Sequence, residues 1–157
     1  QNTIDLSCAC RGISKIEDRY LIGTRGFIEE FSSKFAPLKS RPVDINDDIA
    51  VDKNGCVVFG DNGTSTITKE DKDHNVLFTY KANQLHVAAP FGLAIDSYGY
   101  IYVNCRADDC IHILSQGGRL LKTFEFTGPQ CIKFQENSQR FFVVSSEGIV
   151  NIFKTTW

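Results

Sequence analysis

Apolar and polar residues alternate in short runs along the chain, and the stretch from 90 to 124 shows this pattern most clearly. Apolar, β-branched and aromatic residues form four runs there, at 93–95, 100–103, 111–114 and 120–124. Turn-forming residues separate the runs, at 96–99, 106–109 and 116–118. Runs of this length and composition predict β-strands. Four consecutive antiparallel strands joined by tight turns form one blade of a propeller.

The same unit recurs along the chain. The turn at 52–55 corresponds to the turn at 96–99, 44 positions later, and apolar runs flank both turns in the same way. An internal repeat of about this period indicates a repeat array or a propeller. We therefore predict an all-β fold, a single β-propeller of about four four-stranded blades. The repeat units span about 11–41, 42–84, 85–127 and 128–157.

The strands of the other three units can also be predicted, although the apolar runs are not equally distinct in each unit. In the first unit we expect strands at 11–16, 20–24, 27–31 and 36–43, and in the second at 49–51, 56–59, 64–68 and 76–80. The last unit has only three, at 131–134, 140–145 and 149–154. Pro37 and Pro42 restrict 36–43 to the edge of a sheet, because proline lacks the N–H that a central strand needs. Cys56 and Cys131 lie in apolar runs, and we expect both to be small core residues.

The two ends of the chain suggest how the ring of blades is closed. The last unit lacks a fourth strand, whereas a lone strand-like segment, 3–7, precedes the first unit. Propellers remove open sheet edges by completing one blade from both termini. Either residues 1–10 supply a latch strand for the last blade, or 3–7 belongs to a preceding blade outside this sequence. A homodimer of two half-rings would also close the edges. The absence of methionine indicates a processed form or a piece of a longer chain.

The third unit carries a family resemblance. Its Asp-x-x-Gly turn at 96–99, the approach Pro-Phe-Gly-Leu-Ala-Ile at 90–95 and the strand Tyr-Ile-Tyr-Val at 100–103 resemble NHL repeats. The stretch 110–124 is similar to the propellers of invertebrate tripartite-motif (TRIM-NHL) proteins. The resemblance covers most of the chain and is weakest in the first unit. It implies a β-propeller, usually six-bladed in this family, in a cytoplasmic protein that binds partners.

Composition narrows the function classes. The net charge of −2 and the pI near 5.9 argue against a strongly basic nucleic-acid binder. No apolar run approaches the roughly 20 residues of a membrane span, so we expect no membrane partner. If Gln1 is instead a processed N-terminus, the chain is secreted. In that case Asn62-Gly63-Thr64 is a glycosylation sequon.

Cysteine spacing leaves two alternatives open. Cys105 and Cys110 flank a four-residue turn, so we expect them to face each other across a hairpin, as a disulfide or as two reduced thiols. The resemblance to an intracellular family favours thiols. The spacing of Cys8 and Cys10 does not match a Cys-x-x-Cys redox or zinc half-site.

Neither the histidines nor the acids indicate a catalytic or metal site. His74, His86 and His112 lie in a turn, a connection and a strand, and none pairs with another at ligand spacing. His112 alternates with isoleucines, so we expect it to face solvent or a neighbouring blade. The acids at 47, 48 and 52 lack the spacing of a calcium loop. We therefore predict no catalytic residue, no metal and no cofactor.

The leading hypothesis is a non-enzymatic scaffold that binds a protein through loops beside the channel. The candidate residues are Arg25, Asn62, Arg106 and Asp108 in the loops between second and third strands, and Phe91 before a first strand. An alternative is RNA binding through a basic face of the first unit, formed by Arg11, Lys15, Arg19 and Arg25. A third is a secreted carbohydrate-binding repeat protein, a lectin. It requires one polar and aromatic pair repeated in every loop, and these loops do not repeat.

Overall fold

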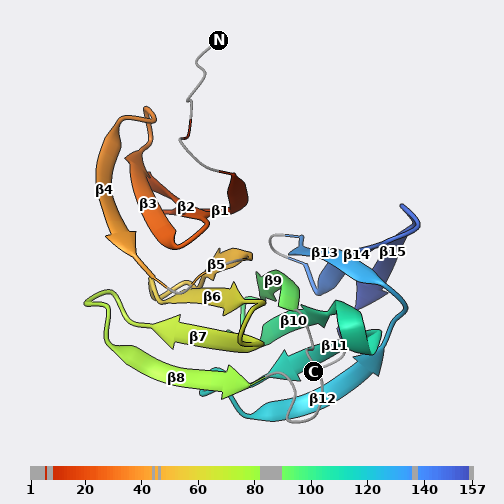
Figure 1. Ribbon diagram of the computed structural model, residues 1–157. Coiled ribbons are helices and arrows are strands. Elements are labelled where there is room, and N and C mark those ends of the chain that lie inside the picture. The colour runs from red at the N-terminus through yellow and green to blue at the C-terminus, as the bar shows by residue number, and fades with distance from the viewer. Residues whose placement is uncertain are drawn as a thin grey trace.

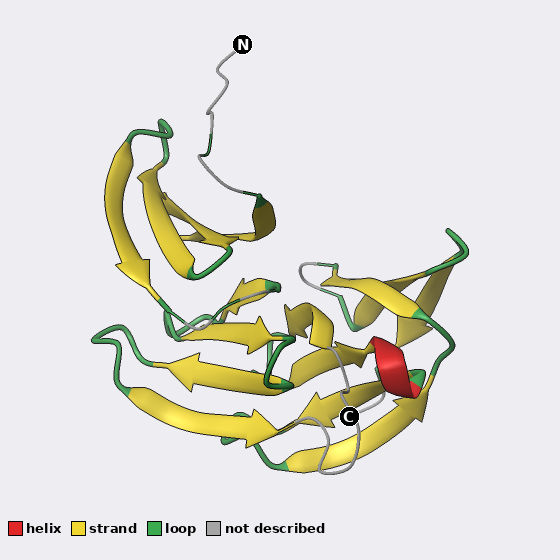
Figure 2. Cartoon of the chain, viewed as in Figure 1, coloured by secondary structure: helices red, strands yellow, loops and turns green. Residues whose placement is uncertain are grey.

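The protein is an all-β propeller of four blades, as its sequence predicts. The computed structural model describes residues 6, 9–43, 45, 47–81, 90–135 and 138–155. Figure 1 shows four antiparallel sheets that follow one another in an arc, with the N-terminal sheet at one end and the C-terminal sheet at the other. Within each sheet the strands follow one another in chain order, from the innermost outward. Figure 2 shows that strands and turns account for nearly all of the described chain.

Three blades have four strands and the last has three among the described residues. Blade 1 contains β1 (Cys10–Ile16), β2 (Arg19–Thr24), β3 (Phe27–Ser32) and β4 (Pro37–Pro42). Blade 2 contains β5 (Ile49–Val51), β6 (Val57–Asp61), β7 (Thr66–Glu70) and β8 (Val76–Lys81). Blade 3 contains β9 (Pro90–Ile95), β10 (Ile101–Cys105), the short 3₁₀ turn η1 (Arg106–Asp108), β11 (Cys110–Leu114) and β12 (Leu120–Glu125). Blade 4 contains β13 (Pro129–Phe134), β14 (Arg140–Ser145) and β15 (Val150–Lys154).

The repeated Asp-x-x-Gly turn has a clear physical basis. The Asp96 carboxylate accepts hydrogen bonds from the backbone N–H groups of Tyr98 and Tyr100, each at 2.9 Å. Asp52 does the same for Asn54 and Cys56 in blade 2. The glycine that completes the turn, Gly99, has a φ of 85°, which residues with a side chain rarely adopt. The turn therefore needs both its aspartate and its glycine.

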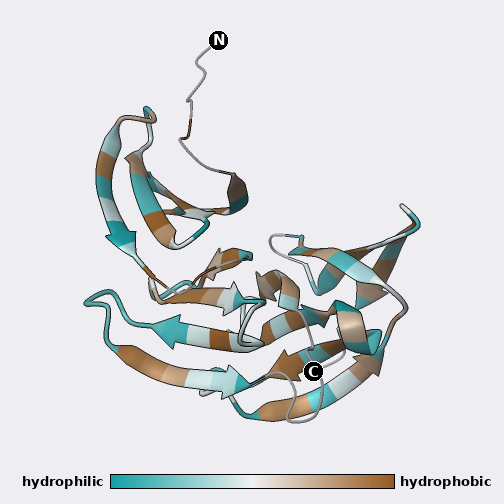
Figure 3. Cartoon of the chain, viewed as in Figure 1, coloured by the Kyte–Doolittle hydropathy of each residue, from teal (hydrophilic) through white to brown (hydrophobic). Residues whose placement is uncertain are grey.

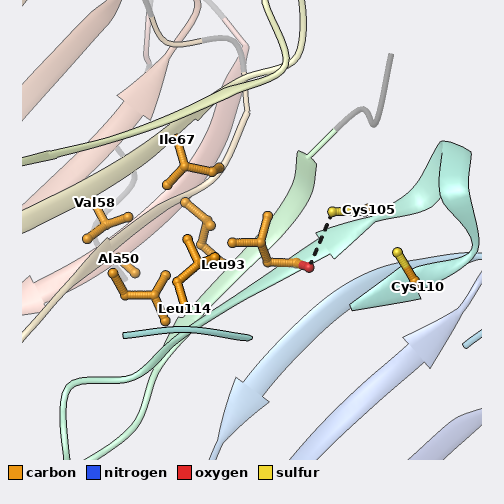
Figure 4. Packing of buried hydrophobic residues seen from close by; sticks show 9 residues of the cluster. Ala50, Val58, Ile67, Leu93, Cys105, Cys110 and Leu114 are labelled. Atoms are coloured by element: carbon orange, nitrogen blue, oxygen red, sulfur yellow. Dashed lines mark hydrogen bonds between the residues drawn. The ribbon is translucent and has the colours of Figure 1, made fainter. Parts of the chain in front are cut away.

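The hydrophobic core lies between blades rather than within them. Three clusters of buried residues fill the three boundaries between neighbouring sheets. The cluster between blades 2 and 3 includes Val58, Ile67 and Leu93, each at most 1% exposed (Figure 4). Because side chains alternate along a strand, each inner blade sends every second residue to one neighbour and the rest to the other. Figure 3 shows this alternation as bands of opposite hydropathy along the strands.

The structure corrects two details of the sequence prediction. The third strand of blade 2 begins at Thr66 instead of residue 64, because Asp61 accepts hydrogen bonds from the N–H of Gly63 and the hydroxyl of Thr64 and so extends the loop. Cys131 is exposed rather than in the core, because it lies on the side of β13 that faces away from blade 3. Cys56 is partly buried.

Two predictions concerned sheet edges and the closure of the propeller, and one of them falls on described residues. The proline-containing strand β4 is an edge strand, as predicted, with its two prolines as its first and last residues. The latch proposed for residues 1–10 falls largely outside the described residues, as does His86. None of the helical structure in the described part of the chain is long and apolar enough to cross a membrane.

Candidate functional site

The loops between second and third strands lie together at one end of the propeller. Because the strands of each blade alternate in direction, these loops share that end with the connections that lead from one blade to the next. We call this end the loop face and define it by 24–27, 43–48, 61–66, 105–110, 126–128 and 145–150, of which 44 and 46 are not described. The opposite end carries the remaining turns, and we call it the turn face.

Asp47 is the most unusual side chain of the loop face. It is only 7% exposed, and its carboxylate accepts a hydrogen bond from the backbone N–H of Asn62. Its Oδ2 atom has no hydrogen-bond partner among the described residues. Burial raises the pKa of Asp47 to about 7, against the opposing charge of Arg11 and with help from the nearby acids Asp48 and Asp61. A buried carboxylate oxygen without a partner is costly, and proteins rarely retain one without a ligand, ion or water.

The neighbouring acid, Asp48, has a structural role instead. Its Oδ1 accepts the N–H of Ile49 at 2.9 Å, and its Oδ2 accepts the N–H of Leu93 at 3.0 Å, so it joins β5 to β9 across the blade boundary. Burial raises the pKa of Asp48, and the positive charge of Lys133 partly offsets this increase. A Cβ atom on Gly12 would lie 2.2 Å from Asp48 Oδ1, so only glycine allows β1 to approach this closely.

A second feature of the loop face is a contact between two predicted residues. The guanidinium of Arg106, in η1, lies 5.1 Å from the centre of the Phe91 ring, at the start of β9. A cation over an aromatic face contributes about 0.5–1 kcal/mol at an exposed site. The contact joins a loop of blade 3 to the approach of the same blade, and it presents a flat apolar ring with a positive charge above it.

The remaining candidates from the sequence are distributed over the loop face. Asn62 lies in the loop of blade 2, and its backbone contacts Asp47. Arg25 is exposed in the loop of blade 1, and Asp108 is half-buried within η1. The structure therefore brings Arg11 and Asn62 together at Asp47 and brings Phe91 to Arg106.

The four basic residues of the first blade do not form one patch. Arg11 and Arg25 lie at the loop-face end, since Cys10 pairs with Thr24. Lys15 and Arg19 lie at the other end of the same strand pair. Arg19 also forms an ion pair with Glu30 at 3.0 Å. The predicted basic rim is thus divided between the two ends of the propeller.

Cys105 and Cys110 face each other directly across the β10–β11 hairpin, as predicted from their spacing. Both are free thiols in the structure. The Cys105 thiol and the His112 ring hydrogen-bond the Cys110 sulfur, and these bonds lower the pKa of Cys110 to about 5 although burial opposes them. The same contact with Cys110, together with burial, raises the pKa of Cys105. His112 faces the neighbouring blade 2, one of the two orientations predicted for it.

The turn face contains an open cavity on the propeller axis. It has a volume of about 390 Å³, and the innermost strands of all four blades line it, from Ser14 in β1 to Phe134 in β13. Asp52 in its wall is paired with Lys69 at 2.9 Å. Lys53 donates to the backbone oxygen of Ser97 at 3.2 Å, which links blades 2 and 3. Asp52 and Lys53 in the wall of this cavity thus each have a partner within the protein.

Sequence reasoning missed Asp47 as a site residue. Two consecutive acids before a strand are typical of turn chemistry. Only the packing of blades 1, 2 and 3 shows that Asp48 is bonded on both oxygens, whereas Asp47 Oδ2 has no partner among the described residues. One signal was present: the corresponding positions in blade 3 are Phe91 and Gly92, without any acid. A signal was also present for His112, because it lies two positions from Cys110 and so shares its face of the strand.

Comparison with known proteins supports the fold. No family model matches the chain, and no curated protein matches it in sequence. Among solved structures, a virginiamycin B lyase from Staphylococcus aureus is similar, with 15% identity and a TM-score of 0.70 over 96% of this chain and 57% of the lyase. The β-propeller domain of Cps50 (Swd1) from Myceliophteria thermophila is similar over 95% of this chain and 55% of its own, with 14% identity and a TM-score of 0.74. The computationally designed Ika4 protein matches over 97% of this chain and 94% of its own, with 15% identity and a TM-score of 0.70.

These likenesses concern the fold alone. The chain spans little more than half the length of the lyase and of the Cps50 domain, and about the full length of Ika4. At 14 to 15% identity, an activity is not transferred with the fold. A propeller fold suits a protein-interaction scaffold, and some propellers with this fold are enzymes, as the lyase shows.

Proposed function

We propose that the chain is a non-enzymatic scaffold that binds a protein partner through its loop face, with Asp47 receiving a basic side chain of that partner. The observation that carries the proposal is that Asp47, only 7% exposed, has an Oδ2 atom with no hydrogen-bond partner among the described residues. A lysine or arginine side chain from outside would supply both the missing hydrogen bond and the missing charge. Interactions of this kind are strongest where water is already excluded.

The surroundings of Asp47 favour a cation as ligand. Asp61 and Asp48 lie close enough to raise its pKa, whereas Arg11 provides the opposing charge. An exposed arginine can move aside when a partner cation arrives, because its long side chain is not held by burial. Phe91 with Arg106 above it, on the next blade, provides an aromatic contact of the type that is enriched at interfaces.

A non-enzymatic role rests on the same geometry. Besides Asp47, the described chain offers an axial cavity in which Asp52 is paired with Lys69 and Asp96 accepts hydrogen bonds from its own turn, and a buried group of two thiols and one imidazole between blades. The similarity of the third unit to NHL repeats supports a binding role as well, because that family binds partners through its propeller. The binding of RNA has less support, since the basic residues of blade 1 lie at opposite ends.

The test is a selection from a displayed library of random peptides on the intact chain. We expect enriched peptides to contain lysine or arginine, and their affinity to fall about tenfold or more for Asp47→Asn, which corresponds to about 1.4 kcal/mol. The matched control is Asp73→Asn, which removes the same charge from an exposed turn on the turn face and leaves the affinity unchanged. Phe91→Ala should weaken the same peptides.

Four results would overturn the proposal. The first is the absence of any enriched peptide, and the second is equal binding by Asp47→Asn and wild-type protein. The third is binding of single-stranded RNA that falls steeply with salt and is lost on Arg11→Glu with Lys15→Glu, which would favour the RNA alternative. Binding that a simple sugar abolishes would favour a lectin instead.

A further inference from the structure

Three potential metal ligands meet between blades 2 and 3, at the loop-face end of the β10–β11 hairpin. Cys105 ends β10, and Cys110 and His112 lie on β11. The two sulfur atoms and one ring nitrogen of His112 all lie within 4.8 Å of one another. The three residues are 0%, 5% and 8% exposed, respectively. Figure 4 shows the two sulfur atoms beside each other at the end of the apolar cluster that fills this boundary.

Strand geometry explains why the three residues converge. Cys105 and Cys110 are direct cross-strand partners, so their side chains project from the same face of the hairpin. His112 lies two residues beyond Cys110 and therefore shares that face. The face turns toward blade 2, because Cys105 and Cys110 belong to the cluster that also contains Val58 and Ile67.

The spacing of the three atoms is close to that of a coordinated ion. Tetrahedral zinc with Zn–S bonds of about 2.3 Å and Zn–N bonds of about 2.0 Å holds its ligand atoms roughly 3.5–3.8 Å apart. Ligand atoms within 4.8 Å of one another need to move by about 1 Å at most, which small rotations of the cysteine side chains provide. Thiolate sulfur with imidazole nitrogen is the donor set that zinc and other thiophilic ions prefer.

Tyr80 completes the arrangement from the neighbouring blade. Its hydroxyl lies 3.0 Å from His112 Nδ1, and the two rings meet edge to face with centres 6.0 Å apart. A metal-bound histidine almost always donates its second N–H to an oxygen, which fixes its tautomer and its orientation. With Nδ1 donating to the Tyr80 hydroxyl, Nε2 is the nitrogen left to bind an ion.

We propose that Cys105, Cys110 and His112 form a binding site for a thiophilic metal ion, with Zn²⁺ as the first ion to test and Tyr80 as the partner that orients the imidazole. The bound ion faces two thiolates and a neutral imidazole, so any proton still held by a thiol is released on binding. Three protein ligands leave the fourth position of a tetrahedral ion to water or an external ligand. Cys105 and Cys110 flank η1, which contains Arg106, so a bound ion would hold the two ends of this loop together. Through Tyr80 the site also links blade 3 to blade 2. The proposal is independent of partner binding at Asp47.

The test is a metal titration of the reduced, chelator-treated chain. Cys8→Ser and Cys10→Ser form the background, so that other thiols near the N-terminus do not contribute. Co²⁺ should produce the near-ultraviolet absorption of cobalt–thiolate bonds, and Zn²⁺ should displace it and compete with a chromophoric chelator at one ion per chain. Cys110→Ala should abolish this binding, and Tyr80→Phe should weaken it about tenfold. Cys131→Ser, which removes an exposed thiol from blade 4, should leave it unchanged.

A second measurement keeps the test decisive if a variant fails to fold. In the background chain, Zn²⁺ should slow alkylation of Cys105 and Cys110, read by peptide mass spectrometry, and leave the rate at Cys131 unchanged. The proposal is overturned if Zn²⁺ protects neither thiol, or if tight binding persists in both Cys110→Ala and His112→Ala. Formation of a Cys105–Cys110 disulfide in air despite excess Zn²⁺ would also overturn it and would identify the pair as a redox switch.

Discussion

Replacing Asp47 with asparagine should stabilise the protein while weakening partner binding. The native carboxyl has its pKa raised from 3.8 to about 7, chiefly by burial, so the folded state disfavours the charged form. Asparagine keeps the shape and one acceptor oxygen, and it never carries that charge. A side chain that lowers stability in the absence of its ligand is typical of binding sites.

The magnitude follows from the shift. One pKa unit corresponds to about 1.4 kcal/mol, so the full shift would correspond to roughly 4 kcal/mol. Because buried sites in proteins behave as if their effective dielectric constant were about 20, we expect only part of this, a gain of about 1–2 kcal/mol at pH 8. Between the unfolded pKa near 4 and the folded pKa near 7, the folded state binds more protons than the unfolded state. Native stability contributed by Asp47 therefore falls as the pH rises through this window.

The assay is urea denaturation of wild-type and Asp47→Asn protein at several pH values. The difference in unfolding free energy should be near zero at pH 4, grow up to pH 7 and stay constant above it. Asp73→Asn, in an exposed turn, should change stability by less than about 0.5 kcal/mol at every pH. Asp71→Asn should show the opposite pH trend, because hydrogen bonds from Asn75 lower the pKa of Asp71. If Asp47→Asn destabilises the protein at pH 8, the argument from burial is wrong.

Two further substitutions test the packing that holds the loop face and the blades in place. Gly12→Ala should lower the unfolding free energy by about 1–3 kcal/mol, since its methyl group would lie 2.2 Å from Asp48 Oδ1. Thermal unfolding would detect this loss as a lower Tm. An unchanged Tm would contradict the close approach of β1 to Asp48. Lys69→Met should lower the unfolding free energy, measured by urea denaturation, by about 3–5 kcal/mol, because it leaves the buried carboxylate of Asp52 without its ion pair. The double variant with Asp52→Asn should recover part of that loss. No recovery would show that packing rather than charge is responsible.

The sequence predicted the architecture well because a propeller repeats one local pattern. The turn at 52–55 and its counterpart at 96–99 each need only a side-chain acceptor and a residue tolerant of positive φ, and both requirements are visible in the sequence. The prediction that Cys105 and Cys110 face each other likewise followed from the length of the loop between them. The start of β7 could not be predicted in this way, because the Thr64 hydroxyl donates a hydrogen bond to the Asp61 carboxylate, which holds Thr64 in the loop.

Site residues were harder to predict, because they depend on contacts between blades. Whether Asp47 is buried, and whether its second oxygen finds a partner, depends on residues of the blade 2 loop, including Asn62. The contact of His112 with Tyr80 crosses a blade boundary over 32 positions of sequence. No local pattern specifies either arrangement. By contrast, Arg106 and Phe91 were both predicted as candidates from their loops, and the structure adds their mutual contact.

The location of the core between blades has a consequence for how the molecule opens. Of the four described sheets, the two middle ones have a neighbouring sheet on each face, and the outer two have one. Apolar side chains at the two ends are correspondingly exposed, at 50% for Ile13 in β1 and 62% for Ile152 in β15. In such an array, stability is approximately a sum over adjacent pairs, so local opening begins at the ends and moves inward. Amide hydrogen exchange should therefore rank the blades by their number of neighbours, with β6 and β10 the last to exchange.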